Sequence, residues 1–314
     1  LVGSEMCIRD RICTSDNQLG GINLEILQLI FSGLASGCIY GLIALGFVLI
    51  YKATEAVNFA QGDMMMIGSL SIISLTSSTA LGLSFIVAIP LMLILMALIG
   101  FLIEKVFITH ITGESQIAIA ILTIAIGFGL RFIAGVIWGY DPQTLESDLI
   151  VTYYNFGELV ISISEVLVII TTLALTLLLY YFFAKTKIGV AMVAVSQNQL
   201  AAYYMGIPVK RMQSLTWIIA GLLAGVAGFL YSAKSSVDPI TGLLGIKAFA
   251  AAVIGGFGSL PGALVGGLVV GLVEPFAARF LPVGYSHLMP YIILVMVLIV
   301  RPHGIFSQTY SKKV

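Results

Sequence analysis

Long stretches without a charged residue constrain the fold of this sequence more than any other feature. A helix needs about 20 mostly apolar residues to cross the hydrocarbon core of a bilayer, and the uncharged runs 26–51, 81–103 and 212–233 are all long enough. Overall, 59% of the residues are hydrophobic and 10% are charged, whereas soluble domains carry roughly 25% charged residues. A soluble core could not cover this apolar surface, so the sequence predicts an all-α polytopic membrane protein.

The charges and cysteines exclude several other classes. Lys plus Arg and Asp plus Glu each total 15, so the net charge is +0, which excludes a polybasic nucleic-acid binder. The hydrophobic content excludes an acidic disordered chain. The 3 cysteines form no CxxC pair and the 3 histidines are scattered, so we expect no disulfide framework, no metal site and no cofactor.

Sequence signatures of catalysis are also missing. The chain has no GxxxxGK[ST] phosphate loop, no GxSxG nucleophile elbow and no soluble stretch long enough for an ATPase domain. We therefore expect no enzyme activity. If ATP drives transport by this protein, the ATPase is a separate chain.

Apolar regions divide the chain into about seven to eight expected transmembrane helices. The regions are 26–51, 64–80, 81–103, 117–138, 159–184, 212–233, 248–273 and 288–300. They form one transmembrane domain over residues 21–307, followed by a short cytoplasmic tail at 308–314. The segment 1–20 begins without Met and holds most of the local polarity, so we expect it to be non-native or disordered.

The loop charges set the expected orientation. Loop 139–158 carries acidic residues and no Lys or Arg. The loop between the fifth and sixth regions and the C-terminus are basic; their cations are Lys185, Lys187, Lys210, Arg211, Arg301, Lys312 and Lys313. Because short cytoplasmic loops are rich in Lys and Arg, we expect the basic loops and the C-terminus inside, and the acidic loop and the N-terminus outside.

A glycine-rich break interrupts the seventh region. One plain crossing there would place the basic C-terminus outside. The residues 248–254 would form only about 10 Å of helix and 263–273 about 16 Å. We therefore expect a re-entrant hairpin of two half-length helices that enters and leaves on the outer side; the alternative is one kinked span. The break residues are candidates to line the substrate route: Gly255, Gly256, Gly258, Ser259, Pro261 and Gly262.

A polar motif precedes the short second region. Asn58, Gln61 and Asp63 would line the same route if the start of this span is unwound, as in the broken helices of transporters. The alternative is an ordinary loop with Asp63 in a favourable first-turn position. Arg131 lies inside the fourth region, where an intramembrane charge suggests function; snorkelling or a structural ion pair is the favoured interpretation.

The basic cytoplasmic loop contains a mildly apolar segment that is too short to span. It is predicted to form a short helix that Gly206 and Pro208 terminate. It would dock either in a groove on a partner protein or on the bilayer surface. The candidate contact residues are Leu200, Ala201, Ala202, Gly206, Ile207 and Pro208.

Several segments together resemble the branched-chain amino-acid ABC transporter permeases, from about residue 22 to 307. Residues 58–63 read NFAQGD, similar to the N-F-A-[HQ]-G-[DE] motif, and 252–263 match the family's glycine break. Residues 200–207 resemble its cytoplasmic A-A-x-x-x-G-I element, 301–306 match its R-P-x-G-[LI]-F ending, and the opening span is similar. The chain departs from the family pattern in two places, because Leu200 replaces a common acidic residue and Ser307 a common glycine.

This resemblance implies the permease subunit of an ATP-driven importer in the bacterial inner membrane. Its implied partners are a related second permease, two cytoplasmic ATPases, a periplasmic binding protein and the bilayer. The resemblance further implies that the short helix at 200–207 contacts the ATPase. Branched-chain amino acids are the expected substrates, and urea or short amides are the alternative. An ion-coupled secondary transporter is the rival class, but the sequence shows no clear repeat and no midplane carboxylate for it.

Overall fold

The protein is a bundle of helices arranged around two central ones. The computed structural model describes residues 3–77, 81–111, 115–145, 153–156, 159–282, 284–302 and 304–306, with side chains from 25 onward except at 153–161. The long helices are α1 (Gly3–Thr54), α3 (Phe85–Ile103), α5 (Gln116–Trp138), α6 (Ile163–Lys185), α9 (Val209–Ser232) and α11 (Leu260–Phe280). The shorter helices are α2 (Gln61–Thr76), α4 (Thr109–Ile111), α7 (Lys187–Gln197), α8 (Gln199–Tyr204), α10 (Leu244–Gly255) and α12 (Tyr285–Val300).

This architecture confirms the prediction of an all-α polytopic membrane protein. Among the described residues, 6 helices are long and apolar enough to cross a bilayer; α2, α10 and α12 are shorter. A π-helical turn, Glu104–Ile108, extends α3. A two-stranded antiparallel hairpin, Tyr153–Phe156 with Leu159–Ser162, precedes α6. The expected helix from 159 therefore starts only at Ile163, where the Ser162 side chain caps it.

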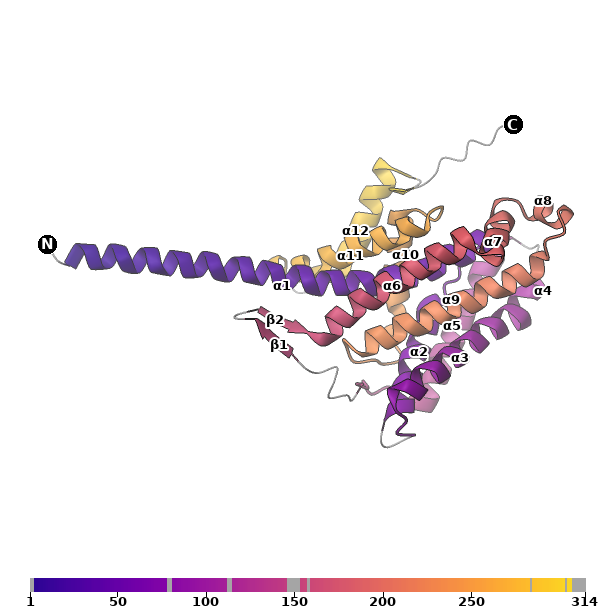
Figure 1. The fold of residues 1–314 in the computed structure, drawn as a ribbon, viewed down its shortest axis with the longest axis horizontal. Helices are drawn as coiled ribbons and strands as arrows, with labels where there is room; N and C mark the ends of the chain where they lie inside the picture. Colours follow the sequence, from indigo (N-terminus) through magenta and orange to yellow (C-terminus); the bar gives the residue numbers. More distant parts are fainter. Residues whose placement is uncertain are drawn as a thin grey trace.

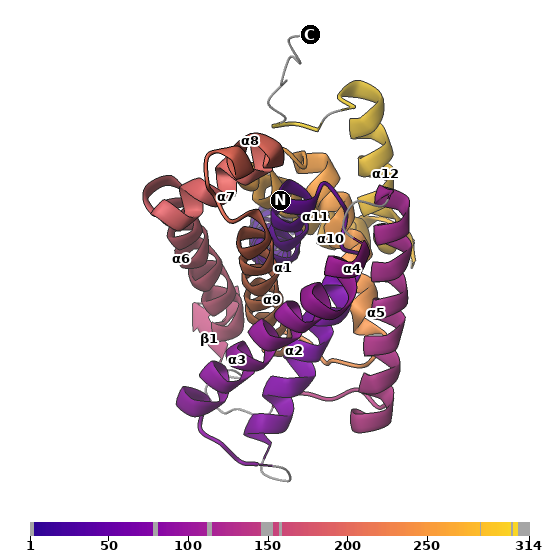
Figure 2. The same ribbon diagram turned by 90° about the vertical axis from the view of Figure 1, so that its right-hand side faces the viewer.

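Helix α1 lies in the middle of the bundle, between α6 and α12 (Figure 2), and its first part projects beyond the other helices (Figure 1). It packs against the antiparallel α11 along glycines from both helices. On α1 these are Gly33, Gly37 and Gly41, and on α11 they are Gly267 and Gly271. A Cβ on Gly37 would lie 2.8 Å from the Leu268 Cα atom. Small residues at such spacing let two helix backbones approach closely in a membrane.

The other central helix, α9, holds α2 and α3. Helix α2 runs in the same direction as α9, because Gln61 Nε2 donates to the Ala220 carbonyl at 3.1 Å and Ser69 Oγ to the Gly228 carbonyl at 2.8 Å. Ala220 lies halfway along the 24-residue helix α9. Helix α2 therefore starts at half depth, and residues 55–60 reach that depth without helical structure.

A second broken span faces the first. After α9 ends, residues 233–243 turn back into the bundle, and α10 begins where Gly245 crosses Gly62. A Cβ on Gly245 would lie 2.7 Å from the Gly62 Cα atom. Helix α10 then continues to the opposite end, where the Phe257 and Tyr51 rings lie 4.8 Å apart. Residues 55–60, the irregular half of the first broken span, thus lie in the half of the membrane near Tyr51. Residues 233–243, the irregular half of the second, lie in the opposite half.

The predicted re-entrant hairpin is wrong in two respects. Helix α11 has 21 residues and is long enough to span, so the two arms are not both half-length. The glycine break lies next to Tyr51, at the end that carries the basic loops, and not part-way through the membrane as a re-entrant turn would. The prediction ended the apolar run before Glu274, but Lys247 neutralises this carboxylate at 2.5 Å, and the helix continues. The seventh region therefore contributes two crossings.

The basic residues gather at one end of the bundle. Helices α7 and α8 lie there beside the C-terminus of α1 (Figure 1), and Gln199 Nε2 donates to the Ala53 carbonyl at 2.9 Å. Lys185 ends α6 at the same end. The predicted tail 308–314 lies outside the described residues. The direction in which this end faces remains a prediction from the loop charges.

Candidate functional site

The NFAQGD motif forms the corner at which the first broken span becomes helical. Asn58 and Gln61 are fully buried. Asn58 Oδ1 accepts from the Ala60 amide at 3.2 Å, and its Nδ2 donates to Gln61 Oε1 at 3.3 Å. The Phe59 amide donates to Thr123 Oγ1 at 3.1 Å. These bonds satisfy backbone and side-chain groups that no water could reach at this depth, as irregular backbone inside a membrane requires.

Asp63, in the first turn of α2, is paired with Arg131 of α5. The Arg131 Nε and Nη2 atoms both donate to Asp63 Oδ1, at 3.0 and 2.8 Å. Gly127 and Gly242 close over the carboxylate, and a Cβ on either residue would overlap it. Arg131 also lies 5.2 Å from the centre of the Phe128 ring. Of the two interpretations of Arg131 that were favoured from the sequence, the structural ion pair is the one that the geometry supports.

The structure does not bring the two halves of the predicted route together. Asp63 lies at the start of α10, and the glycine break lies at its end, 12 residues or about 18 Å of helix away. The residues that close on Gly62 and Asp63 are instead Gly242 and Gly245, which sequence analysis missed. The sequence feature that could have identified them is the pair of glycines itself, which lies just before the apolar segment 248–254.

The glycine break is held by the C-terminal segment. The Ile305 amide donates to the Ile254 carbonyl at 2.9 Å, and the Phe306 amide to the Gly255 carbonyl at 3.1 Å. Gly256 has φ +96 and Gly304 has φ +85, which are values that favour glycine. Ser259 Oγ accepts from the Gly262 amide at 3.2 Å and so caps α11, with Pro261 in its first turn. The RPHGIF ending and the glycine break therefore form one structural unit.

The short helix predicted at 200–207 is confirmed as α8, and glycine ends it as predicted. The Ile207 amide donates to the Ala202 carbonyl at 3.0 Å and the Gly206 amide to the Tyr203 carbonyl at 2.9 Å, with Gly206 at φ +81. This is the Schellman arrangement of a helix C-terminus. Ala202 is 4% exposed and packs with Ile207 in a small core against α7 and α9.

The outward face of α8 is apolar. Leu200, Tyr203, Tyr204 and Met205 have 66%, 68%, 77% and 82% of their surface exposed. We call these four residues the α8 face. Beside it lies a groove of about 500 Å³ with Lys210 and Arg211 on its wall. The sequence predicts a contact at Ala202, but this residue is buried and anchors α8 to the bundle. The exposed residues are instead the aromatic ones, Tyr203 and Tyr204, which the sequence-based prediction does not include.

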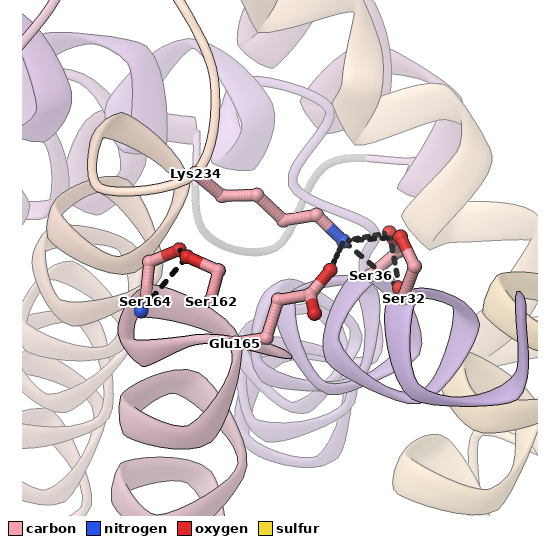
Figure 3. A network of polar contacts seen from close by, with 6 residues as sticks. All are labelled: Ser32, Ser36, Ser162, Ser164, Glu165 and Lys234. Atoms are coloured by element: carbon pink, nitrogen blue, oxygen red, sulfur yellow. Dashed lines mark hydrogen bonds and ion pairs between the residues drawn. The ribbon is translucent and has the colours of Figure 1, made fainter. Parts of the chain in front are cut away.

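At the end of the bundle opposite α8, Lys234 contacts residues of two helices (Figure 3). Its Nζ atom donates to the Ser32 carbonyl and to Ser36 Oγ, both at 2.8 Å, and lies 3.8 Å from Glu165 Oε1. It therefore joins the loop after α9 to α1 and to the first turn of α6.

Comparison with known proteins gives consistent matches along the chain. Residues 29–298 match the family described as branched-chain amino acid transport system / permease component. The high-affinity branched-chain amino acid transport system permease protein BraD of Pseudomonas aeruginosa is 32% identical over 92% of this chain and 98% of its own. LivH of Salmonella typhimurium, of the same description, is 31% identical over 93% and 98%. The probable permease LivH of Methanocaldococcus jannaschii is 30% identical over 86% and 89%.

Proposed function

The chain belongs to the family of branched-chain amino acid transport permease components, and from this premise we propose that it forms the membrane pathway of an ATP-driven importer of branched-chain amino acids. The observation that carries the proposal is the family match over residues 29–298. The proposed partners are a related second permease, two cytoplasmic ATPase subunits and a periplasmic binding protein.

Reconstitution of the complete transporter tests this function. Proteoliposomes that contain the chain, a second permease and the ATPase subunits should take up radiolabelled leucine only when ATP and the loaded binding protein are both supplied. Omission of the ATPase should abolish uptake. Uptake driven by a sodium or proton gradient without ATPase subunits would contradict the proposal and favour a secondary transporter.

We place the ATPase contact at the α8 face. The exposed apolar side chains project beside cationic residues of the same loop, so they fit a groove that is apolar inside and acidic at its rim. Within the α8 segment, Leu200 would enter that groove. Ala201 lies beside it, while Ala202, Gly206, Ile207 and Pro208 would hold the helix end in shape. The closure of the ATPase would then reach α9 and α6 through the loop.

A matched pair of tyrosine substitutions tests this contact. Burying an aromatic side chain of this kind contributes about 1.5–3 kcal/mol, so Tyr203→Glu should weaken ATPase binding by about tenfold or more. Co-purification of the ATPase and its transport-stimulated hydrolysis report the loss. Tyr140→Glu, which changes a 66% exposed tyrosine at the opposite end of the bundle, should leave both readouts unchanged. If Tyr203→Glu retains full coupling, α8 lies on the bilayer surface instead.

We propose that the NFAQGD motif has a structural role next to the substrate route and does not itself contact the substrate. Asn58, Gln61 and Asp63 use their polar atoms within the chain, so their role is to hold the start of α2 against α5 and α9. The Gly255–Gly262 turn would lie at the cytoplasmic mouth of the route, under the C-terminal segment.

A further inference from the structure

A charged cavity lies beside Lys234 and has no counterpart in the sequence-based predictions. It has a volume of about 360 Å³, and helices α1, α9, α10, α11 and α12 contribute to its wall. We call it the outer chamber. Its central charged groups are Lys247 of α10 and Glu274 of α11. These two residues directly flank the apolar run 248–273 in the sequence. This volume is sufficient for a small organic ligand.

The charged groups of the outer chamber keep free hydrogen-bonding capacity. Lys247 Nζ lies 2.5 Å from Glu274 Oε1 and 3.3 Å from His287 Nδ1. The Tyr40 hydroxyl donates to Glu274 Oε2 at 2.7 Å. An ammonium has three donors and a carboxylate about four lone-pair positions. Each group can therefore bind a ligand without giving up the contacts that position it.

The charges and the apolar wall of the chamber complement an amino acid. The lining residues include the ammonium groups of Lys234 and Lys247 and the carboxylate of Glu274, so groups of both signs face a ligand. Glu165, which does not line the chamber, lies 3.8 Å from Lys234 and balances the second ammonium, so the site as a whole suits a zwitterion. Aliphatic side chains also line the chamber, with Ile39 and Leu244 among them. A branched aliphatic chain would pack there while the charged ends of the ligand meet Lys247 and Glu274.

We propose that the outer chamber is a binding site for the zwitterionic head group of the transported amino acid, with Lys247 facing the carboxylate and Glu274 the ammonium. The proposal rests on the proposed function, because it takes the substrate to be a branched-chain amino acid. It adds a substrate-binding site within the permease, at the end of the bundle opposite the α8 face. Intramembrane ionisable residues mark substrate pathways in other membrane proteins.

Protection from alkylation tests binding directly. Ser286 lines the chamber, so Ser286→Cys, in a chain whose own cysteines are replaced by serine, should react with N-ethylmaleimide. Leucine should slow this reaction in the purified complex. The amine without the carboxylate, 3-methylbutylamine, and the acid without the ammonium, 4-methylpentanoate, should need about tenfold or higher concentrations for the same protection. Equal protection by all three compounds, or none by leucine, would overturn the proposal.

Charge exchange separates binding from a structural ion pair. Lys247→Glu with Glu274→Lys should restore a folded complex but require at least about tenfold more leucine for half-maximal protection. Leucine protection at wild-type concentrations in this double variant would mean that the pair is only structural and would overturn the proposal. The control is Glu25→Gln. It breaks an exposed ion pair with Arg279, which lies on α11 as Glu274 does, and it should leave the leucine concentration for half-maximal protection unchanged. If the exchanged chain does not fold, the proposal is tested by the protection experiment with the three ligands in the chain that keeps Lys247 and Glu274.

Uptake by the same proteoliposomes distinguishes this proposal from the proposed function. ATP-dependent leucine uptake without leucine protection of Ser286→Cys would refute the chamber and leave the importer standing. Leucine protection with no ATP-dependent uptake would refute the importer and leave the chamber as an amino-acid site.

Discussion

Arg131→Met should destabilise the folded chain by about 3 kcal/mol. The substitution leaves the Asp63 carboxylate, whose side chain is 5% exposed, without a cation among the described side chains that contact it. Removing one partner of a buried ion pair costs far more than the pair contributes, because the remaining charge stays desolvated. The thermal midpoint and the monodisperse fraction of the detergent-purified chain measure the effect.

Two further variants show whether the buried charge is the cause. Asp63→Asn combined with Arg131→Met removes both charges and should recover most of the lost stability. Arg279→Met breaks a 2.6 Å pair with Glu25, but the Arg279 side chain is 56% exposed, so this substitution should cost much less stability than Arg131→Met. If Arg131→Met costs no more than Arg279→Met, Asp63 finds water or another partner, and the corner is more open than the structure shows.

Gly271→Leu should prevent the chain from folding. A Cβ on Gly271 would overlap the Gly37 backbone, and both sides of this contact are main chain, so neither can move without separating α1 from α11. Overpacking of a core typically costs about 1–3 kcal/mol when side chains can adjust, and here they cannot. The amount of folded protein recovered from membranes should fall to a small fraction of the wild-type amount.

Gly129 provides the matched control. It also lies within a helix, α5, but no atom lies within 4 Å of the position that its Cβ would take. Gly129→Leu should therefore fold normally, and the better helix propensity of leucine would contribute about 0.5–1 kcal/mol. Equal losses from Gly271→Leu and Gly129→Leu would mean that glycine content, and not the contact between α1 and α11, controls folding.

Local features of the sequence were sufficient for several parts of this architecture. The uncharged runs predicted the long helices, because their length alone matches the thickness of a bilayer. Gly206 and Pro208 predicted the end of α8, because a positive φ and a missing amide are properties of single residues. The loop charges predicted that the basic segments gather at one end, where α7, α8 and the end of α1 lie.

The main failures involve partners that are distant in sequence. Gln61 starts α2 at half depth because it bonds to Ala220, 159 residues away. Glu274 was taken as the end of an apolar run, but Lys247 lies 27 residues earlier and neutralises it. Ala202 reads as a surface residue until α7 and α9 cover it. A sequence shows which residues are polar, but not which polar residues meet.

The two broken spans also determine where this protein can open at low cost. Residues 55–60 and 233–243 lack the continuous ladder of main-chain bonds that makes a helix cooperative, so they can open in small steps, whereas a full helix must give up a whole turn. In hydrogen–deuterium exchange, their amides should lose protection first. In a complex with the proposed ATPase subunits, ATP binding should change the exchange rates of these amides before those of α1 or α9. Because one segment lies on each side of the Gly62–Gly245 crossing, either side of the membrane can loosen while the other stays closed.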